Sequence, residues 1–109
     1  MSRFTIHDLA ATIDARAASS AEASYTKKLL DKGAEHCAKK FGEEAVEVVL
    51  AAVAKDKGAL TEESADVLYH LLVLWAACGV LPKDVYAALA AREGQSGLAE
   101  KAGRKKKPA

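Results

Sequence analysis

The sequence predicts an all-α fold, a helical bundle of about five helices, and three observations support this prediction. Half of the residues are apolar, mainly Ala, Leu and Val, and only 6% are aromatic, a composition that suits packed helices better than a sheet. No stretch shows the strict alternation of apolar and polar residues that is typical of a strand. Two long helix-like runs flank a breaker at residues 55–58, which predicts an antiparallel helical hairpin at the centre of the bundle.

Two helices are expected before the hairpin. Residues 5–18 carry a regularly spaced apolar stripe, and Thr5 with an acid three residues later has the form of a capping box. A short helix then begins at Ser24 or Thr26, whose hydroxyls suit an N-terminal cap, and Gly33 is expected to end it.

The hairpin and one further helix complete the expected bundle. The first long helix is expected over residues 34–55, with a turn at residues 56–58. Thr61 is expected to cap the second long helix, which would run to about Cys78. A final helix is expected from Pro82, since proline suits a first helical position. Its expected buried side chains are Val85, Tyr86 and Leu89.

The chain is expected to form one folded domain, residues 1–92, followed by a basic and disordered tail, residues 93–109. The tail holds five Lys or Arg and two Glu, whereas the whole chain has a formal net charge of +1, so the folded part is net acidic. A net acidic domain argues against nucleic acid as a partner, although a helical dimerisation module with a nucleic-acid-binding tail is the non-enzymatic alternative. Without a signal-peptide pattern or an apolar run of membrane-spanning length, we expect a cytoplasmic protein with no membrane partner.

Four acidic residues form two pairs with helical spacing. Glu44 and Glu47 lie three residues apart on the first long helix, and Glu63 and Asp66 do so on the second. Residues three apart share one face of a helix, so an antiparallel hairpin can bring all four carboxylates towards one point. Carboxylates that close repel one another unless a cation lies among them, and oxygen ligands suit Mg²⁺. The pattern therefore predicts a magnesium site held by these four residues.

The surroundings of these acids distinguish them from an ordinary solvated helix face. At about 100° per residue, apolar side chains surround much of the first long helix and leave only a narrow strip for Glu44 and Glu47. On the second helix Glu63, Asp66 and His70 share one stripe of an otherwise apolar cylinder. Because an unpaired buried carboxylate is costly, this setting favours a metal site over the alternative that the acids only pair with nearby surface lysines.

The acid pattern and the segments around it resemble the all-α nucleoside triphosphate pyrophosphatases of the MazG-like superfamily. Their mark is an E-x-x-E pair followed by E-x-x-D, and here 15 residues separate the two pairs. Three segments look like the phosphoribosyl-ATP pyrophosphatase family within it. They are Ser24-Tyr25-Thr26 with Leu29-Leu30 and Gly33, residues 39–47, and residues 65–74. The resemblance covers roughly residues 4–92 and leaves the basic tail outside.

The resemblance implies an activity, a cofactor and an assembly. The implied reaction is Mg²⁺-dependent hydrolysis of phosphoribosyl-ATP to phosphoribosyl-AMP and pyrophosphate, the second step of histidine biosynthesis. The family also implies a homodimer of intertwined helical subunits, with sites built where the subunits meet. The alternative is a related pyrophosphatase acting on another nucleoside triphosphate, which would share the four acids.

The resemblance also suggests roles for single residues. The four acids would bind Mg²⁺, and Glu43 or Glu47 would orient or activate the attacking water. Lys27 is one candidate for phosphate binding, and Lys40 fits the family motif best. The residues expected to bind substrate are Tyr25, Thr26, Lys28, Lys39, Lys40 and His70.

Overall fold

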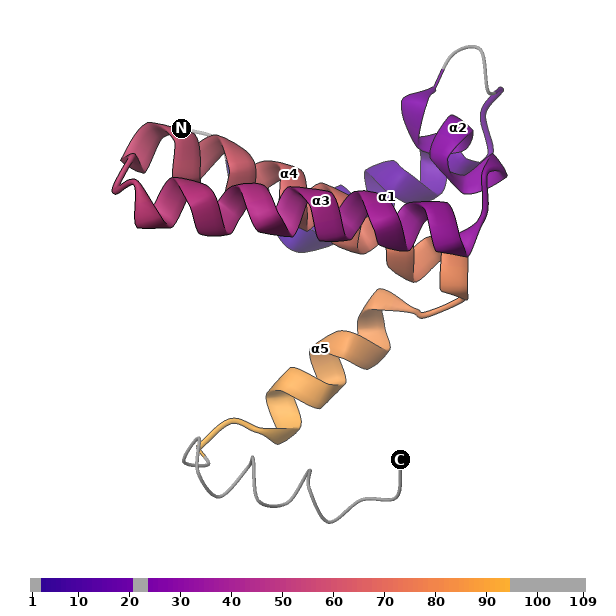
Figure 1. Ribbon diagram of the computed structural model, residues 1–109. Helices are drawn as coiled ribbons and strands as arrows, with labels where there is room; N and C mark the ends of the chain where they lie inside the picture. The colour runs from indigo at the N-terminus through magenta and orange to yellow at the C-terminus, as the bar shows by residue number, and fades with distance from the viewer. Residues whose placement is uncertain (1–2, 21–23, 95–109) are drawn as a thin grey trace.

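The computed structural model describes residues 3–20 and 24–94 and shows the expected all-α fold. No strand occurs among these residues. Figure 1 shows two long helices lying side by side, with shorter helices at one end and one helix directed away from them. The helices are α1 (Ile6–Ala17), α2 (Tyr25–Asp31), α3 (Ala34–Val53), α4 (Lys57–Cys78) and α5 (Pro82–Ala91).

The hairpin of α3 and α4 forms the centre of the fold, as predicted. Lys55 reverses the chain with a φ of 58°, and Asp56 follows in an extended conformation. The Asp56 carboxylate accepts a hydrogen bond from the Ala59 amide at 3.0 Å and so caps α4. The prediction that Thr61 caps this helix is therefore wrong. Thr61 lies inside the helix, where its hydroxyl donates to the Lys57 carbonyl oxygen at 2.8 Å.

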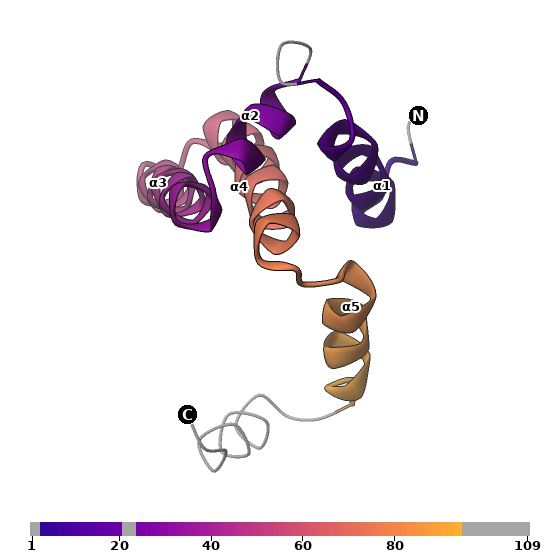
Figure 2. The same ribbon diagram turned by 90° about the vertical axis from the view of Figure 1, so that its right-hand side faces the viewer.

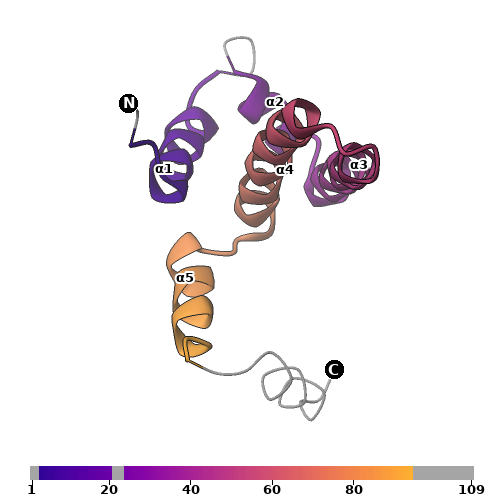
Figure 3. The same cartoon turned by 90° about the vertical axis from the view of Figure 1, so that its left-hand side faces the viewer.

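Helix α1 covers α4 on the side away from α3, and α2 lies at the end of the hairpin in contact with both long helices; Figures 2 and 3 show α4 between α1 and α3. The predicted capping box of α1 is present, because Thr5 and Asp8 exchange side-chain and backbone hydrogen bonds. Ser24 caps α2, accepting a hydrogen bond from the Lys27 amide at 3.2 Å. The buried core lies at one end of the hairpin and contains side chains from each of the first four helices. Its buried members are Ile13, Leu29, Cys37, Leu72 and Val73.

Helix α5 leaves the hairpin instead of packing along it. Gly79 ends α4 in the left-handed conformation, with a φ of 72°, and α5 then runs away from the other helices (Figures 1 and 2). The prediction that Leu89 is buried is wrong, since its side chain is 59% exposed, whereas Val85 and Tyr86 are half-buried. Most of the expected basic tail, residues 95–109, lies outside the described residues.

The helices of the described residues were also compared with the length and hydropathy that a membrane span requires. None of them meets both conditions by itself. Helices α4 and α5 together reach them, by length and composition only, but the pair is bent by 112° at its break.

Candidate functional site

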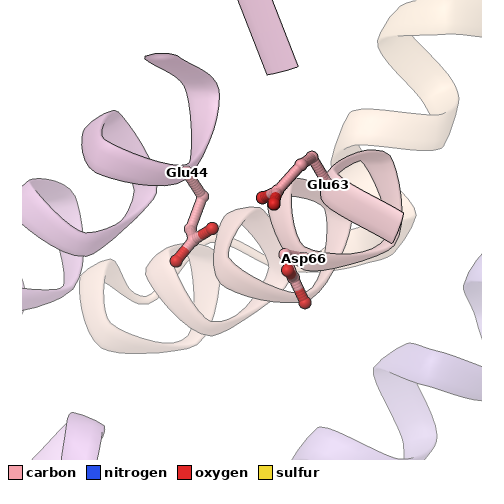
Figure 4. Close-up of side chains that lie close together, drawn as sticks. All are labelled: Glu44, Glu63 and Asp66. Atoms are coloured by element: carbon pink, nitrogen blue, oxygen red, sulfur yellow. The ribbon is translucent and has the colours of Figure 1, made fainter. Parts of the chain in front are cut away.

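Three carboxylates meet between the two hairpin helices and form the acid cluster, Glu44, Glu63 and Asp66. One carboxylate oxygen of each residue lies within 4.8 Å of the others. Figure 4 shows Glu44 extending from α3 towards Glu63 on α4, with Asp66 one turn further along α4. Glu44 and Glu63 are half-buried, and Asp66 is exposed. The hairpin therefore brings together three of the four acids that the sequence singles out as metal ligands.

The electrostatics of the acid cluster indicate a place for a cation. Partial burial raises the pKa of Glu63 above its ordinary value, and the negative charges of Asp66, Glu44 and Glu47 raise it further. Three carboxylate oxygens this close are a donor set that a hard divalent cation would fit. A cation bound among them would replace this repulsion with attraction.

Glu47 lies at the margin of the acid cluster. It is close enough for its charge to act on Glu63, but its side chain is exposed and it is not one of the three residues whose oxygens converge. Glu43, the other candidate for activating water, is also exposed, and one of its carboxylate oxygens lies 3.4 Å from the Lys40 Nζ atom. The structure thus separates a converging trio from two acids that border it.

His70 lies beside the acid cluster on the buried side of α4. Its side chain is 6% exposed, and burial lowers its pKa. Glu44 and Asp66 act in the opposite direction, whereas the charge of Lys40 also lowers the pKa. The charges of both acids and of Lys40 therefore all act on the imidazole, and Lys40 is the lysine that the sequence predicts to bind phosphate.

Aromatic rings continue the site from α4 to α2. The Tyr69 and His70 rings meet edge to face with their centroids 5.1 Å apart, and the Tyr25 ring lies nearly parallel to that of Tyr69 at 6.4 Å. The Thr26 hydroxyl and the Tyr69 hydroxyl form a hydrogen bond of 2.6 Å. Tyr25 is exposed, whereas Thr26 is completely buried and so does not reach the surface where a substrate would bind.

A basic pocket of about 460 Å³ opens next to these rings, between α2 and α3. It contains two of the predicted substrate-binding lysines, Lys28 and Lys40, and Tyr25 forms part of its wall. Lys32 and His36 also line it, and we did not single them out from the sequence. Their spacing was the available signal, because Lys32 follows Lys28, and Lys40 follows His36, by one helical turn.

The remaining lysine candidates lie outside this pocket. Lys39 is exposed on α3 and does not line the pocket. Lys27 forms an ion pair with Asp31 on its own helix, with 2.7 Å between Nζ and Oδ1. The structure therefore brings Lys28 and Lys40 to the site and leaves Lys27 and Lys39 at its edge.

Comparison with known proteins gives matches along nearly the whole chain. The family model for phosphoribosyl-ATP pyrophosphohydrolase matches residues 6–93, which include all five helices. A Rhodopseudomonas palustris protein named phosphoribosyl-ATP pyrophosphatase 1 is 68% identical over 97% of this chain and 99% of its own length. A Bradyrhizobium diazoefficiens protein of the same name is 67% identical over 96% of this chain and 99% of its own length. A Nitrobacter hamburgensis phosphoribosyl-ATP pyrophosphatase is 64% identical over 95% of this chain and 97% of its own length.

Proposed function

This chain belongs to the phosphoribosyl-ATP pyrophosphohydrolase family, and we propose that its acid cluster is the centre at which it hydrolyses phosphoribosyl-ATP. The reaction consumes one water and yields phosphoribosyl-AMP and pyrophosphate, a step of histidine biosynthesis. The convergence of Glu44, Glu63 and Asp66 beside a basic pocket carries this assignment. Hydrolysis of a phosphoric anhydride needs both neutralised phosphate charge and a placed water, and these two regions supply the groups for both.

The names of the relatives favour phosphoribosyl-ATP over another nucleoside triphosphate. The acid cluster alone does not discriminate, because any pyrophosphatase of this type would use such acids. The relatives that share 64% to 68% of their residues with this chain over nearly its whole length all carry the name phosphoribosyl-ATP pyrophosphatase. We therefore prefer that substrate to the alternative of a different nucleotide.

The acid cluster would hold Mg²⁺, with Glu47 completing the set of ligands from its margin. Three converging carboxylate oxygens and the raised pKa of Glu63 fit a hard cation of this kind. When bound, Mg²⁺ would neutralise phosphate charge and lower the pKa of a water molecule. The ligands lie on two rigid helices, so the protein holds them in position before the substrate arrives.

Glu43 and Glu47 are the candidates for handling the attacking water. Both are exposed and lie on α3 within one turn of Glu44. A carboxylate beside the cluster can accept the proton that the water loses as it attacks phosphorus. Because Glu43 lies near Lys40 in this structure, Glu47 is the better placed of the two for the base role.

The pocket beside the acid cluster would bind the substrate. Lys28 and Lys40 line it and would contact phosphate oxygens, with Lys39 at its edge as a further contact. The exposed ring of Tyr25 offers a flat surface on which a purine base can stack. His70, between the rings and the acids, would orient the part of the substrate that spans both regions.

We also propose that the active protein is a homodimer. Val46, Val49, Leu50 and Val53 form the apolar stripe of α3, and they are 56% to 75% exposed in the single chain. Their spacing places them on one helix face, and exposed apolar patches of this kind mark protein interfaces. Helix α5, which packs little on its own chain, would extend the same interface.

Both cysteines are free, which suits the cytoplasmic location expected from the sequence.

Product analysis tests the proposed function. Purified protein given phosphoribosyl-ATP and Mg²⁺ is expected to release pyrophosphate and phosphoribosyl-AMP in equal amounts. Orthophosphate as the product, or no turnover, would contradict the assignment. A panel of other nucleoside triphosphates measured in the same assay is expected to give lower kcat/KM values, and a higher value for one of them would favour the alternative substrate.

A further inference from the structure

One buried hydrogen bond ties the short helix α2 to the hairpin. The hydroxyl oxygens of Thr26 and Tyr69 lie 2.6 Å apart, although 43 residues separate them in the chain. Thr26 has no exposed surface at all, and Tyr69 is half-buried. A buried hydroxyl that loses its partner is costly, so this pair specifies one position of α2 against α4.

Apart from that bond, α2 is held by apolar packing, by the stacking of Tyr25 on Tyr69 and by one hydrogen bond to α3. The helix has seven residues, and only Thr26 and Leu29 among them are buried. Leu29 packs in the core, and its carbonyl oxygen accepts a hydrogen bond from the Cys37 thiol. Apolar packing sets the depth of a helix but leaves it free to rotate or slide by small amounts, whereas a hydrogen bond is directional. The Thr26–Tyr69 bond therefore supplies the directional attachment of α2 to α4, as the Cys37–Leu29 bond does to α3.

The position of α2 matters because the helix carries part of the pocket wall. Tyr25 and Lys28 line the basic pocket from α2, and Lys40 lines it from α3. The other end of the hydrogen bond, Tyr69, follows Asp66 of the acid cluster by three residues on α4 and contacts His70. The bond thus spans from the substrate-binding groups of α2 to the helix that carries two of the cluster's three acids.

We propose that Thr26 is a positioning residue, which acts through its hydrogen bond to Tyr69 to hold the pocket groups of α2 at a fixed place relative to the acid cluster. Its buried hydroxyl does not contact the substrate. The inference rests on the proposed function, since it concerns how that site is aligned. A displacement of about 1 Å in a substrate-positioning group can cost a factor of about 100 in rate or binding, so a small loss of alignment is measurable.

Three variants test the bond. Thr26→Val keeps the shape of the side chain but removes its hydroxyl, and Tyr69→Phe removes the other partner. We expect each to raise KM for phosphoribosyl-ATP by about tenfold, a change that corresponds to one lost, directional contact. The affinity of the substrate-free protein for Mg²⁺, measured by calorimetry, is expected to stay within about twofold, because the acids lie on α3 and α4. Thr26→Ser keeps the hydroxyl and is expected to restore KM.

The double variant Thr26→Val/Tyr69→Phe tests whether the two residues raise KM through one shared bond or independently of each other. If both residues act through one bond, its KM equals that of either single variant, whereas additive increases would overturn the proposal. Thr12→Val is the matched control, because its hydroxyl donates to the Asp8 carbonyl oxygen on α1 and does not touch the pocket. A fall in kcat that only matches a fall in the folded fraction measured by circular dichroism, with unchanged KM, would also overturn the proposal, since it would indicate a loss of folded enzyme only.

Amide hydrogen exchange tests the same bond without turnover. Thr26→Val is expected to speed exchange in α2 at least about tenfold while leaving α3 and α4 within about twofold of the parent protein. If the α2 amides exchanged at the same rate in Thr26→Val and in the parent protein, an anchoring role for Thr26 would be contradicted. If the parent protein releases no pyrophosphate, the proposed function fails, and the exchange measurement still decides whether Thr26 holds α2.

Discussion

The two faces of α3 differ from those of an ordinary surface helix, because charged groups lie on the face towards α4 and exposed apolar side chains lie on the face away from it. The face towards α4 carries Lys40 and Glu44, both half-buried, together with the buried Cys37, and it lies beside the buried His70 of α4. The opposite face carries the apolar stripe, Val46 to Val53, which is largely exposed. In a monomeric globular protein the apolar stripe usually faces the core and the charges face water.

This inversion suggests that each face requires a different partner. Half-buried carboxylates that repel one another need a cation, and the basic pocket beside them needs an anion such as a polyphosphate. An exposed stripe of valine and leucine needs another apolar surface, because burying it removes the cost of its contact with water. One helix would therefore serve both chemistry and assembly, and changes on its two faces should have separable effects.

The largest effect is expected from removing a charge in the acid cluster. Glu44→Gln and Glu63→Gln keep the side-chain shape and are expected to lower kcat/KM at least about 100-fold and to weaken Mg²⁺ binding. Glu47→Gln is expected to lower kcat strongly but to weaken Mg²⁺ binding less, since Glu47 lies at the margin of the cluster. Steady-state kinetics across a Mg²⁺ titration measures both quantities.

Glu62→Gln is the matched control for these variants. Glu62 is the exposed neighbour of Glu63 on α4 and lies outside the acid cluster. Its activity and Mg²⁺ affinity are expected to match those of the parent protein. Full Mg²⁺-dependent activity in Glu44→Gln or Glu63→Gln would show that the cluster does not bind the catalytic ion.

The next largest effect is expected on the opposite face, in assembly. Val49→Glu places a charge in the middle of the apolar stripe, and we expect the dimer dissociation constant to rise about 100-fold, because a buried unpaired charge is costly. Analytical ultracentrifugation over a range of concentrations measures this change. Ala15→Glu adds the same charge to an exposed position of α1 and is expected to leave the assembly unchanged. An unaltered dimer in Val49→Glu would place the interface elsewhere.

A smaller effect, on stability, is expected from the repulsion within the acid cluster. Because the pKa of Glu63 is raised in the folded state, the folded metal-free protein binds more protons than the unfolded chain at pH values just above the ordinary glutamate pKa. Stability therefore falls as pH rises through that window. Without metal at about pH 7.5, Glu63→Gln is therefore expected to unfold at a higher temperature than the parent protein.

Two further conditions sharpen this stability comparison. Below a pH of about 4.5 the two proteins should converge, because the Glu63 carboxyl is then protonated in both the folded and the unfolded parent protein. Mg²⁺ should reverse their order at neutral pH, since it stabilises only the protein that can bind it. Thermal unfolding curves at several pH values, with Mg²⁺ or a chelator, provide the measurement. A parent protein that is more stable than Glu63→Gln without metal at neutral pH would contradict the repulsion.

The smallest effect is expected at Gly42, four residues before Val46 on the same side of α3. A Cβ atom added there meets no atom within 4 Å in the single chain. Gly42→Ala is therefore expected to raise the free energy of unfolding by about 1 kcal/mol, the usual gain inside a helix. Chemical denaturation measures it. A loss of stability instead would indicate that the backbone of a partner packs closely against this glycine.

Sequence reasoning predicted the elements of this protein well where the signal is local. The capping box at Thr5, the end of α4 at about Cys78 and the acid pairs on α3 and α4 all depend on residues within one or two turns of each other. The cap of α4 was predicted five residues late, because Asp56 and Thr61 are both good caps. The chain reversal at Lys55 decides between them, and its positive φ is not evident from a lysine in the sequence.

For the candidate site, helical periodicity in the sequence was enough to predict which residue types face the interior of the hairpin, because it assigns each side chain to a helix face. Which of these side chains come close to one another depends on the packing of the helices and is seen only in the folded structure. The alignment of α3 against α4 brings Glu44 to Glu63 and leaves Glu47 at the margin, and the docking of α2 turns Thr26 inward and gathers Lys32 and His36 around the pocket. The physical reason is that periodicity sets an angle around one helix, whereas contacts between helices depend on their relative shift and rotation, which the packing of the whole chain determines.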